Sequence, residues 1–364
     1  MKKFTRWLAL LLIISIMTAK VDVYAESVSV ESVTVVIPEV QGKLTIGWIS
    51  DMHIIDDYTG HSSVTNGLND LILRAEGFRS EGHTISYARQ QWLRNAEYLS
   101  SLNPDVVILG GDIIDYFSDN NVEVLKQGLS MFNCPVMYLR ADHDYEPKYA
   151  SLDDVTTRNR HSGIYADNPS ANVIRIKGIS IVGITDSTRQ VSSEQLSVIQ
   201  QEVASNKVIL ATHVPYASKV SDSLKQLSIS KRGREYYWGS STWSPSGATS
   251  SLISMIESGN SIPLVLCGHM HTSWDGEIVA GVRQHIFNPG YSTSVGLVHI
   301  SGSSQDTPDP EKPVPGPAPE PVVPDPVLPI IPEPEFPDDP RYTFNIEGRQ
   351  GDPDRYKKEQ IIRK

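Results

Sequence analysis

The sequence predicts an α/β fold with a mostly parallel sheet, on three observations. Five short apolar runs rich in β-branched residues are bounded by turn residues, as buried strands are. A helical pattern between the first two runs gives the strand, helix, strand order of a parallel sheet. Each run ends one or two residues before an Asp or His, and open α/β sheets bind ligands at the carboxyl ends of their strands. The runs are residues 44–50, 106–110, 136–140, 207–211 and 263–267.

Further elements are predicted around these strands, beginning with an edge strand within the polar, β-branched residues 26–41. Residues 54–85 are polar and contain glycine, so we interpret them as an inserted loop or lid. Helical spacing of apolar side chains and flanking breaker residues predict helices at 86–102, 192–204 and 248–258. Residues 172–185 form a predicted hairpin that turns at Lys177 and Gly178, and residues 276–282, 285–288 and 296–301 are predicted strands of a second sheet.

Residues 1–25 are predicted to be a signal peptide. Lys2, Lys3 and Arg6 precede an apolar stretch too short for a typical membrane span, and residues 23–25 fit a small-residue cleavage site. An uncleaved N-terminal anchor is the alternative. No later segment is long and apolar enough to cross a bilayer, so we expect a secreted, extracellular protein that is not transmembrane after processing.

The composition changes after Ser304, which marks the end of a domain at residues 26–304. Residues 305–340 are acidic and contain 14 prolines, a density that predicts a disordered linker. The tail at 341–364 ends in basic residues, which predicts contact with an anionic cell surface.

The formal net charge is −11, so nucleic acid is not the expected partner, whereas a small phosphate ester held by metal ions is compatible with this charge. An exported protein could pair its two cysteines. However, Cys134 and Cys267 lie in or beside apolar runs, which favours thiols over a disulfide.

The strand ends carry side chains of metal-ligand type. Alone, an Asp-x-His or a Gly-Gly-Asp is more often an ordinary turn, and Gly-His-x-His after a buried strand is more specific. Carboxylates and imidazoles together suit Zn²⁺, Fe or Mn²⁺, so the set predicts a two-metal site and a hydrolase. The set comprises Asp51, His53, Asp112, Asp115, Asp142, His143, His213, His269 and His271.

The order of these motifs resembles the calcineurin-like metallophosphoesterase family, which includes purple acid phosphatases and many phosphodiesterases. The family pattern is D-x-H, G-D-x-x-D, G-N-H-[DE], a single H and G-H-x-H, and the resemblance covers about residues 43–301. Residues 287–290 also match a closing N-P-G turn. The resemblance implies a four-layer sandwich of two mixed β-sheets flanked by helices, with the metal site at the carboxyl ends of the strands.

The resemblance also implies a reaction and a role for each residue. Two ions of Fe, Mn or Zn, about 3.5–4 Å apart, would clamp a phosphate mono- or diester, and a metal-bound hydroxide would attack it. Asp112 would bridge the ions, His143 would serve as general acid or transition-state stabiliser, and Asp115 would orient His143. The first ion would be held by Asp51, His53 and His271, and the second by Asp142, His213 and His269.

The chain departs from the family pattern at Ala141 and Asp142, where the family has Gly and Asn. The extra negative charge should bind the second cation more tightly, and a degenerate site is the alternative. Ser273 and its neighbours also stand where glycines usually follow the last motif. The basic and aromatic residues 231–238, with Trp243, either flank the metals or form an ordinary packed loop. Five other histidines fit no ligand position and are interpreted as surface or core residues: His61, His83, His161, His285 and His299.

Two other functions compete with an exported phosphoesterase. A metallo-β-lactamase-type hydrolase needs a His-x-His-x-Asp-His cluster, which the sequence lacks. A non-catalytic cell-surface or adhesion module could retain the same fold and use the proline-rich segment as a stalk. Metal content together with turnover distinguishes these alternatives.

Overall fold

The computed structural model describes residues 28–55, 85–115, 119–145, 171–185, 190–259 and 261–303. The predicted signal peptide, nearly all of the insertion at 54–85 and both C-terminal segments lie outside these ranges, so they stay predictions. Within the described ranges, no helix is both long and apolar enough to cross a membrane. Cys134 and Cys267 are both thiols, as predicted.

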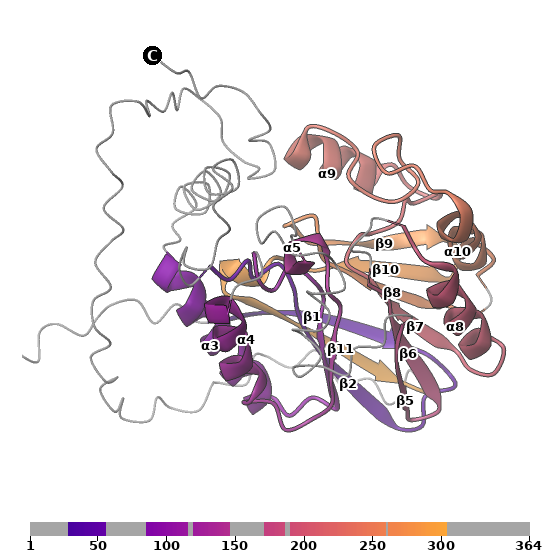
Figure 1. Cartoon of the computed structure of the whole chain (residues 1–364). Coiled ribbons are helices and arrows are strands. Elements are labelled where there is room, and N and C mark those ends of the chain that lie inside the picture. The colour runs from indigo at the N-terminus through magenta and orange to yellow at the C-terminus, as the bar shows by residue number, and fades with distance from the viewer. Residues whose placement is uncertain are drawn as a thin grey trace, which may run out of the picture.

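A five-stranded mixed sheet contains the first four strands of the described residues and the last one (Figure 1). One pair of neighbouring strands, the second and third in the order, is antiparallel, and the other three pairs are parallel. The order is β1 (Ser29–Val36), β11 (Ser294–Ser301), β2 (Lys43–Ile49), β3 (Val106–Leu109) and β4 (Val136–Tyr138).

A six-stranded mixed sheet packs against the first. Its outermost pair at each edge is antiparallel, and its inner pairs are parallel. The order is β5 (Asn172–Ile176), β6 (Ile179–Gly183), β7 (Val208–Ala211), β8 (Leu264–Cys267), β10 (Val282–Ile286) and β9 (Trp274–Val279).

Helices cover the outer faces of both sheets and complete four layers (Figure 1). The outer face of the first sheet packs on α3 (Ile85–Ser101) and α4 (Asp119–Leu129), and that of the second packs on α8 (Ser193–Val203) and α10 (Gly247–Glu257). The fold predicted from the family resemblance is therefore confirmed. The shorter elements are α5 (Asp142–Tyr145), α9 (Ser223–Arg232) and the 3-10 turn η1 (Gly290–Ser292).

The continuous apolar runs are explained by burial on both faces of each central strand. Along β3, Val106 and Ile108 point into the core between the sheets, whereas Val107 and Leu109 point into the core under the helices. Side chains alternate between faces along a strand, so a strand covered on both sides must be apolar at every position.

Most local predictions are confirmed, with two corrections. The hairpin turns at Lys177 and Gly178, which have φ of 48° and 86°, and a capping box between Ser192 and Gln195 begins α8. The predicted strand at 276–282 is wrong, because the chain turns at Ala280 and Gly281 between β9 and β10. The prediction that residues 296–301 join the second sheet is also wrong. Strand β11 instead lies between β1 and β2 in the first sheet, because it pairs with both of them over its length.

Candidate metal centre

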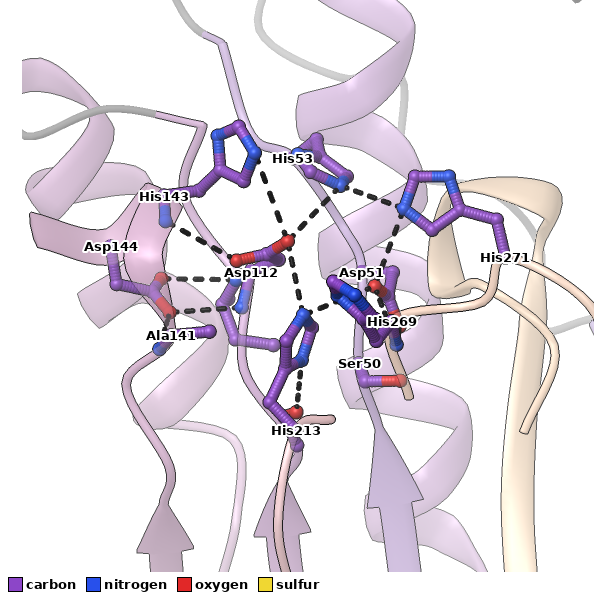
Figure 2. Close-up of polar contacts among 12 residues, drawn as sticks. Ser50, Asp51, His53, Asp112, Ala141, His143, Asp144, His213, His269 and His271 are labelled. Atoms are coloured by element: carbon purple, nitrogen blue, oxygen red, sulfur yellow. Dashed lines mark hydrogen bonds and ion pairs between the residues drawn. The ribbon is translucent and has the colours of Figure 1, made fainter. Parts of the chain in front are cut away.

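The predicted ligands lie on loops at the carboxyl ends of strands from both sheets, and these loops meet around Asp112 (Figure 2). The rim that the sequence predicts is therefore shared by two sheets. The first sheet contributes Asp51 and His53 after β2, Asp112 and Asp115 after β3, and His143 from α5 after β4; the second contributes His213 after β7, and His269 and His271 after β8.

Five of these residues have a left-handed backbone, which is uncommon outside glycine. Such strain persists only where the surroundings enforce it, and it concentrates at functional sites. For Asp51, His53 and Asp112, hydrogen bonds between the loops after β2 and β3 restrain the backbone. The His53 amide donates to the Asp112 carbonyl at 3.0 Å, and the Asp51 amide donates to the Gly111 carbonyl at 2.9 Å. The φ angles are 52° for Asp51, 46° for His53, 52° for Asp112, 69° for His269 and 49° for His271.

Asp112 occupies the centre of the cluster. Its Oδ2 lies 3.2 Å from Nε2 of His213, 3.7 Å from Nε2 of His53 and 4.0 Å from Nε2 of His143. Burial alone would raise the pKa of Asp112, but the surrounding imidazoles, led by His213, hold it well below its usual value. The carboxylate is therefore ionised and faces groups from both sheets.

Asp51 forms a second carboxylate centre. Its Oδ1 lies 3.4 Å from Nε2 of His271 and 3.8 Å from Nε2 of His213, and both carboxylate oxygens accept from the His269 amide at 3.1 Å. Burial opposes ionisation here too, yet the neighbouring His213 and His271 lower the pKa of Asp51. Asp51 is therefore also ionised, in a position beside the ligands of the second sheet.

Hydrogen bonds select the tautomers of two histidines. Nδ1 of His213 lies 2.8 Å from the Gly110 carbonyl, which can only accept, so Nδ1 carries the proton. Nδ1 of His53 lies 2.8 Å from Oδ1 of Asp115 and donates to that carboxylate. In the neutral form of both rings the lone pair is then on Nε2, which points toward Asp112, as in metal-bound histidines with an outer hydrogen-bond partner.

His269 and His271 are held neutral. Burial, which disfavours the imidazolium, lowers the pKa of His269 well below its usual value and that of His271 to about 4. The His269 ring stacks on Tyr236 with centroids 4.2 Å apart. Neutral imidazole is the form that binds a metal ion.

The donor set fits metal ions. Nε2 of His269 is buried and has no hydrogen-bond partner among the described residues, which is costly unless something binds it. Nε2 of His53 and Nε2 of His271 face each other at 3.1 Å, and a cation bound to both nitrogens would take the place of that hydrogen bond. Within each of three groups, the ligand atoms lie within 4.8 Å of one another. The groups are Asp51, His53 and His271; His53, Asp112 and His143; and Asp51, Asp112 and His213.

The structure places the Asp115 carboxylate nearer to His53 than to its expected partner His143. The Asp115 carboxylate lies 2.8 Å from Nδ1 of His53 but 3.5 Å from Nδ1 of His143, and its carbonyl oxygen is the group 3.2 Å from His143. Asp115 thus contacts both rings, one through its side chain and one through its backbone. Asp142 begins α5, but its side chain lies outside the described atoms, so its role as a ligand stays a prediction.

Sequence reasoning assigned no role to Asp144, which is fully buried beside the site. Its carboxylate accepts the hydroxyl of Tyr138 and four backbone amides, three from the loop that carries Asp112 and one from Ala141. Asp144 therefore holds the loop after β3 against the loop after β4 (Figure 2). The position of Asp144 beside His143 was the available signal.

The basic and aromatic segment does flank the centre. Tyr236 and Trp243 are buried, and both rings contact the His269 ring. Arg232 is also buried and donates to the His269 carbonyl at 3.0 Å. The segment thus packs behind a ligand.

The chain is similar to known proteins. A family model for calcineurin-like phosphoesterases matches residues 44–273. Among solved structures, a dimetal phosphatase from Danio rerio has 12% identity and a TM-score of 0.44, and the match covers 68% of this chain and 88% of that one. A conserved protein from Streptococcus pneumoniae, described as a predicted phosphoesterase, has 10% identity and a TM-score of 0.25, with 68% and 74% covered. No curated protein matches the sequence.

Proposed function

Because the chain belongs to the calcineurin-like phosphoesterase family, we propose that it hydrolyses small phosphate mono- or diesters with two transition-metal ions. The convergence of carboxylates and imidazoles around Asp112 is the observation that carries this proposal. The matched residues 44–273 include every predicted site residue. Fe, Mn and Zn all suit this mixture of oxygen and nitrogen ligands.

We assign the ligands to two ions that would share Asp112. Asp51, His53 and His271, which form one of the three ligand groups, would hold the first ion. As the family pattern implies, His213 and His269 would hold the second, with Asp142 as its further predicted ligand. When bound, a pair of ions supplies the charge that clamps a phosphate and acidifies a water. Asp112 suits the shared position because its Oδ2 faces His53 from one side and His213 from the other.

His143 is the group we assign to proton transfer. Its Nδ1 faces the Asp115 carbonyl at 3.2 Å, and since a carbonyl can only accept, Nδ1 carries a proton. A second proton on Nε2, which faces the centre 4.0 Å from Asp112, can then pass to the leaving-group oxygen of the ester. His143 also belongs to one ligand group, so metal content of a His143→Ala variant distinguishes an acid from a ligand.

The test is turnover by the full chain with Mn²⁺ or Zn²⁺, on nitrophenyl phosphate and on bis-nitrophenyl phosphate. We expect hydrolysis of at least one ester and its loss in Asp112→Asn, with no loss in Asp222→Asn, which changes an exposed aspartate outside the site. A protein that binds metal but hydrolyses neither these nor other phosphate esters would instead be the non-catalytic surface module.

Export of the protein and surface contact by its tail are part of the same proposal. The basic and apolar pattern of residues 1–25 supports export, and the basic end of residues 341–364 supports contact with an anionic cell surface. Fractionation of cells that produce the full chain, compared with a chain ending at Ser304, tests both statements. Retention of the full chain inside the cell would contradict export.

A further inference from the structure

We propose that Glu31, on the N-terminal strand β1, is a positioning residue for the metal ligand His271, and this inference rests on the proposed function. Glu31 lies outside the matched residues 44–273. It lies on a strand that carries no motif of the site, so its contacts link a separate strand to the metal centre.

Glu31 connects two loops that border the site. Its Oε1 accepts the hydroxyl of Ser273, which lies two residues after His271. Its Oε2 accepts the backbone amide of Asn288 at 3.0 Å and the side-chain amide of Asn288 at 3.2 Å. Asn288 in turn accepts the Ser273 amide through Oδ1 at 3.1 Å. Each of the three residues therefore contacts the other two.

The turn that begins at Asn288 also contacts His271. Tyr291 lies in this turn, and its hydroxyl is 3.3 Å from Nδ1 of His271. The turn is also fastened to the ligand loop of β2, since the Gly290 amide donates to the Ser50 carbonyl at 2.7 Å. Glu31 thus restrains His271 in two ways. It holds Ser273, in the chain that follows His271, and it holds the turn that carries Tyr291, whose hydroxyl contacts Nδ1 of His271.

The strand pattern shows that Glu31 is unusual for its position. Side chains alternate along a strand, so Glu31 shares a face with Val33, which is buried in the core between the sheets. The Glu31 side chain is only 16% exposed, and Nε2 of His285 lies 2.8 Å from it. An inward charge can also protect an edge strand from unwanted pairing, so the contacts with the site need a direct test.

The test is Mn²⁺ binding to the full chain, measured by electron paramagnetic resonance of the free ion, together with the Tm of each variant. Glu31→Gln keeps the shape of the side chain but replaces one acceptor oxygen with a donor. We expect the affinity for one of the two Mn²⁺ ions to fall by about tenfold, which is the lower end of the loss in metal affinity when an outer partner of a ligand is removed. Ser273→Ala, which leaves β1 unchanged, should lower the affinity for the same ion by a smaller factor.

Val33→Ala is the matched control, because it removes core packing from the same strand without touching the site. It should lower Tm while both Mn²⁺ affinities stay unchanged. The inference is overturned if Glu31→Gln and Ser273→Ala bind both ions as the wild type does, or if Val33→Ala weakens binding as much as Glu31→Gln. A wild-type chain that binds neither Mn²⁺ nor Zn²⁺ overturns the proposed function itself.

Discussion

Replacement of Asp144 should show how strongly one carboxylate holds the loop of Asp112. In Asp144→Ala, four buried backbone amides lose their acceptor. An unsatisfied buried donor costs about 1–3 kcal/mol, so the free energy of unfolding should fall by about 4 kcal/mol or more. That is a large share of the roughly 5–15 kcal/mol typical of a native protein.

Asp144→Asn should lower the free energy of unfolding by an intermediate amount, because one side-chain oxygen remains as an acceptor. If the amide nitrogen takes the place of Oδ2, it faces the amides of Asp112 and Ala141, and these two donors lose their acceptor. The expected loss is about 2–6 kcal/mol. Tyr138→Phe removes a single donor from the same carboxylate and should cost only about 1.5 kcal/mol.

Urea unfolding of the full chain, followed by circular dichroism, measures these differences at constant metal concentration. Since Asp112 lies on the loop that Asp144 holds, the order of stability should also be the order of metal affinity. Asp144→Ala losing no more stability than Tyr138→Phe would refute the reasoning, because the four amide bonds would then contribute nothing measurable.

Four other outcomes are expected. Asp142→Ala should weaken the second ion and cut turnover, whereas Asp142→Asn should stay active with a lower pH optimum; unchanged metal content in Asp142→Ala would exclude it as a ligand. His143→Ala should lower kcat by about 10²–10⁴-fold, and less for nitrophenol esters, whose leaving group needs no proton; equal losses for good and poor leaving groups would argue against the acid. A chain ending at Ser304 should keep its kcat, metal content and Tm, and misfolding would show that the tail packs on the domain. Burial alone would raise the pKa of Glu31, but contacts led by His285 lower this pKa from its usual 4.5. The ionised Glu31 therefore stabilises the fold above pH 4.5, and this stabilisation is lost as the pH falls through the folded pKa. Between about pH 5 and pH 3, urea midpoints should therefore depend less on pH in Glu31→Gln than in the wild type, and equal slopes would contradict this.

The elements that could be predicted from the sequence are those whose signal is local. Strand β3 is apolar at every position because both of its faces are buried, and Asp112 follows its end after Gly110 and Gly111. The cap of α8 is similarly local, since Ser192 and Gln195 are three residues apart. Such patterns identify an element and its ends without knowledge of its neighbours.

What could not be predicted depends on contacts between distant segments. Nothing local in β11 shows that it lies between β1 and β2, since the pairing partners are more than 200 residues away. Asp144 acts on amides about 30 residues earlier, and Glu31 acts on Asn288, 257 residues later. The family resemblance paired Asp115 with His143, but its carboxylate could be assigned to His53 only from the folded geometry.

The number of metal ions bound per chain tests the central claim most directly. Elemental analysis of the full chain, purified without chelator and with metal returned, should give two transition-metal ions in the wild type. The count should fall in Asp112→Asn, because Asp112 is the carboxylate that faces ligands of both ions. A wild-type chain with no stoichiometric metal after this treatment would contradict the account of the site.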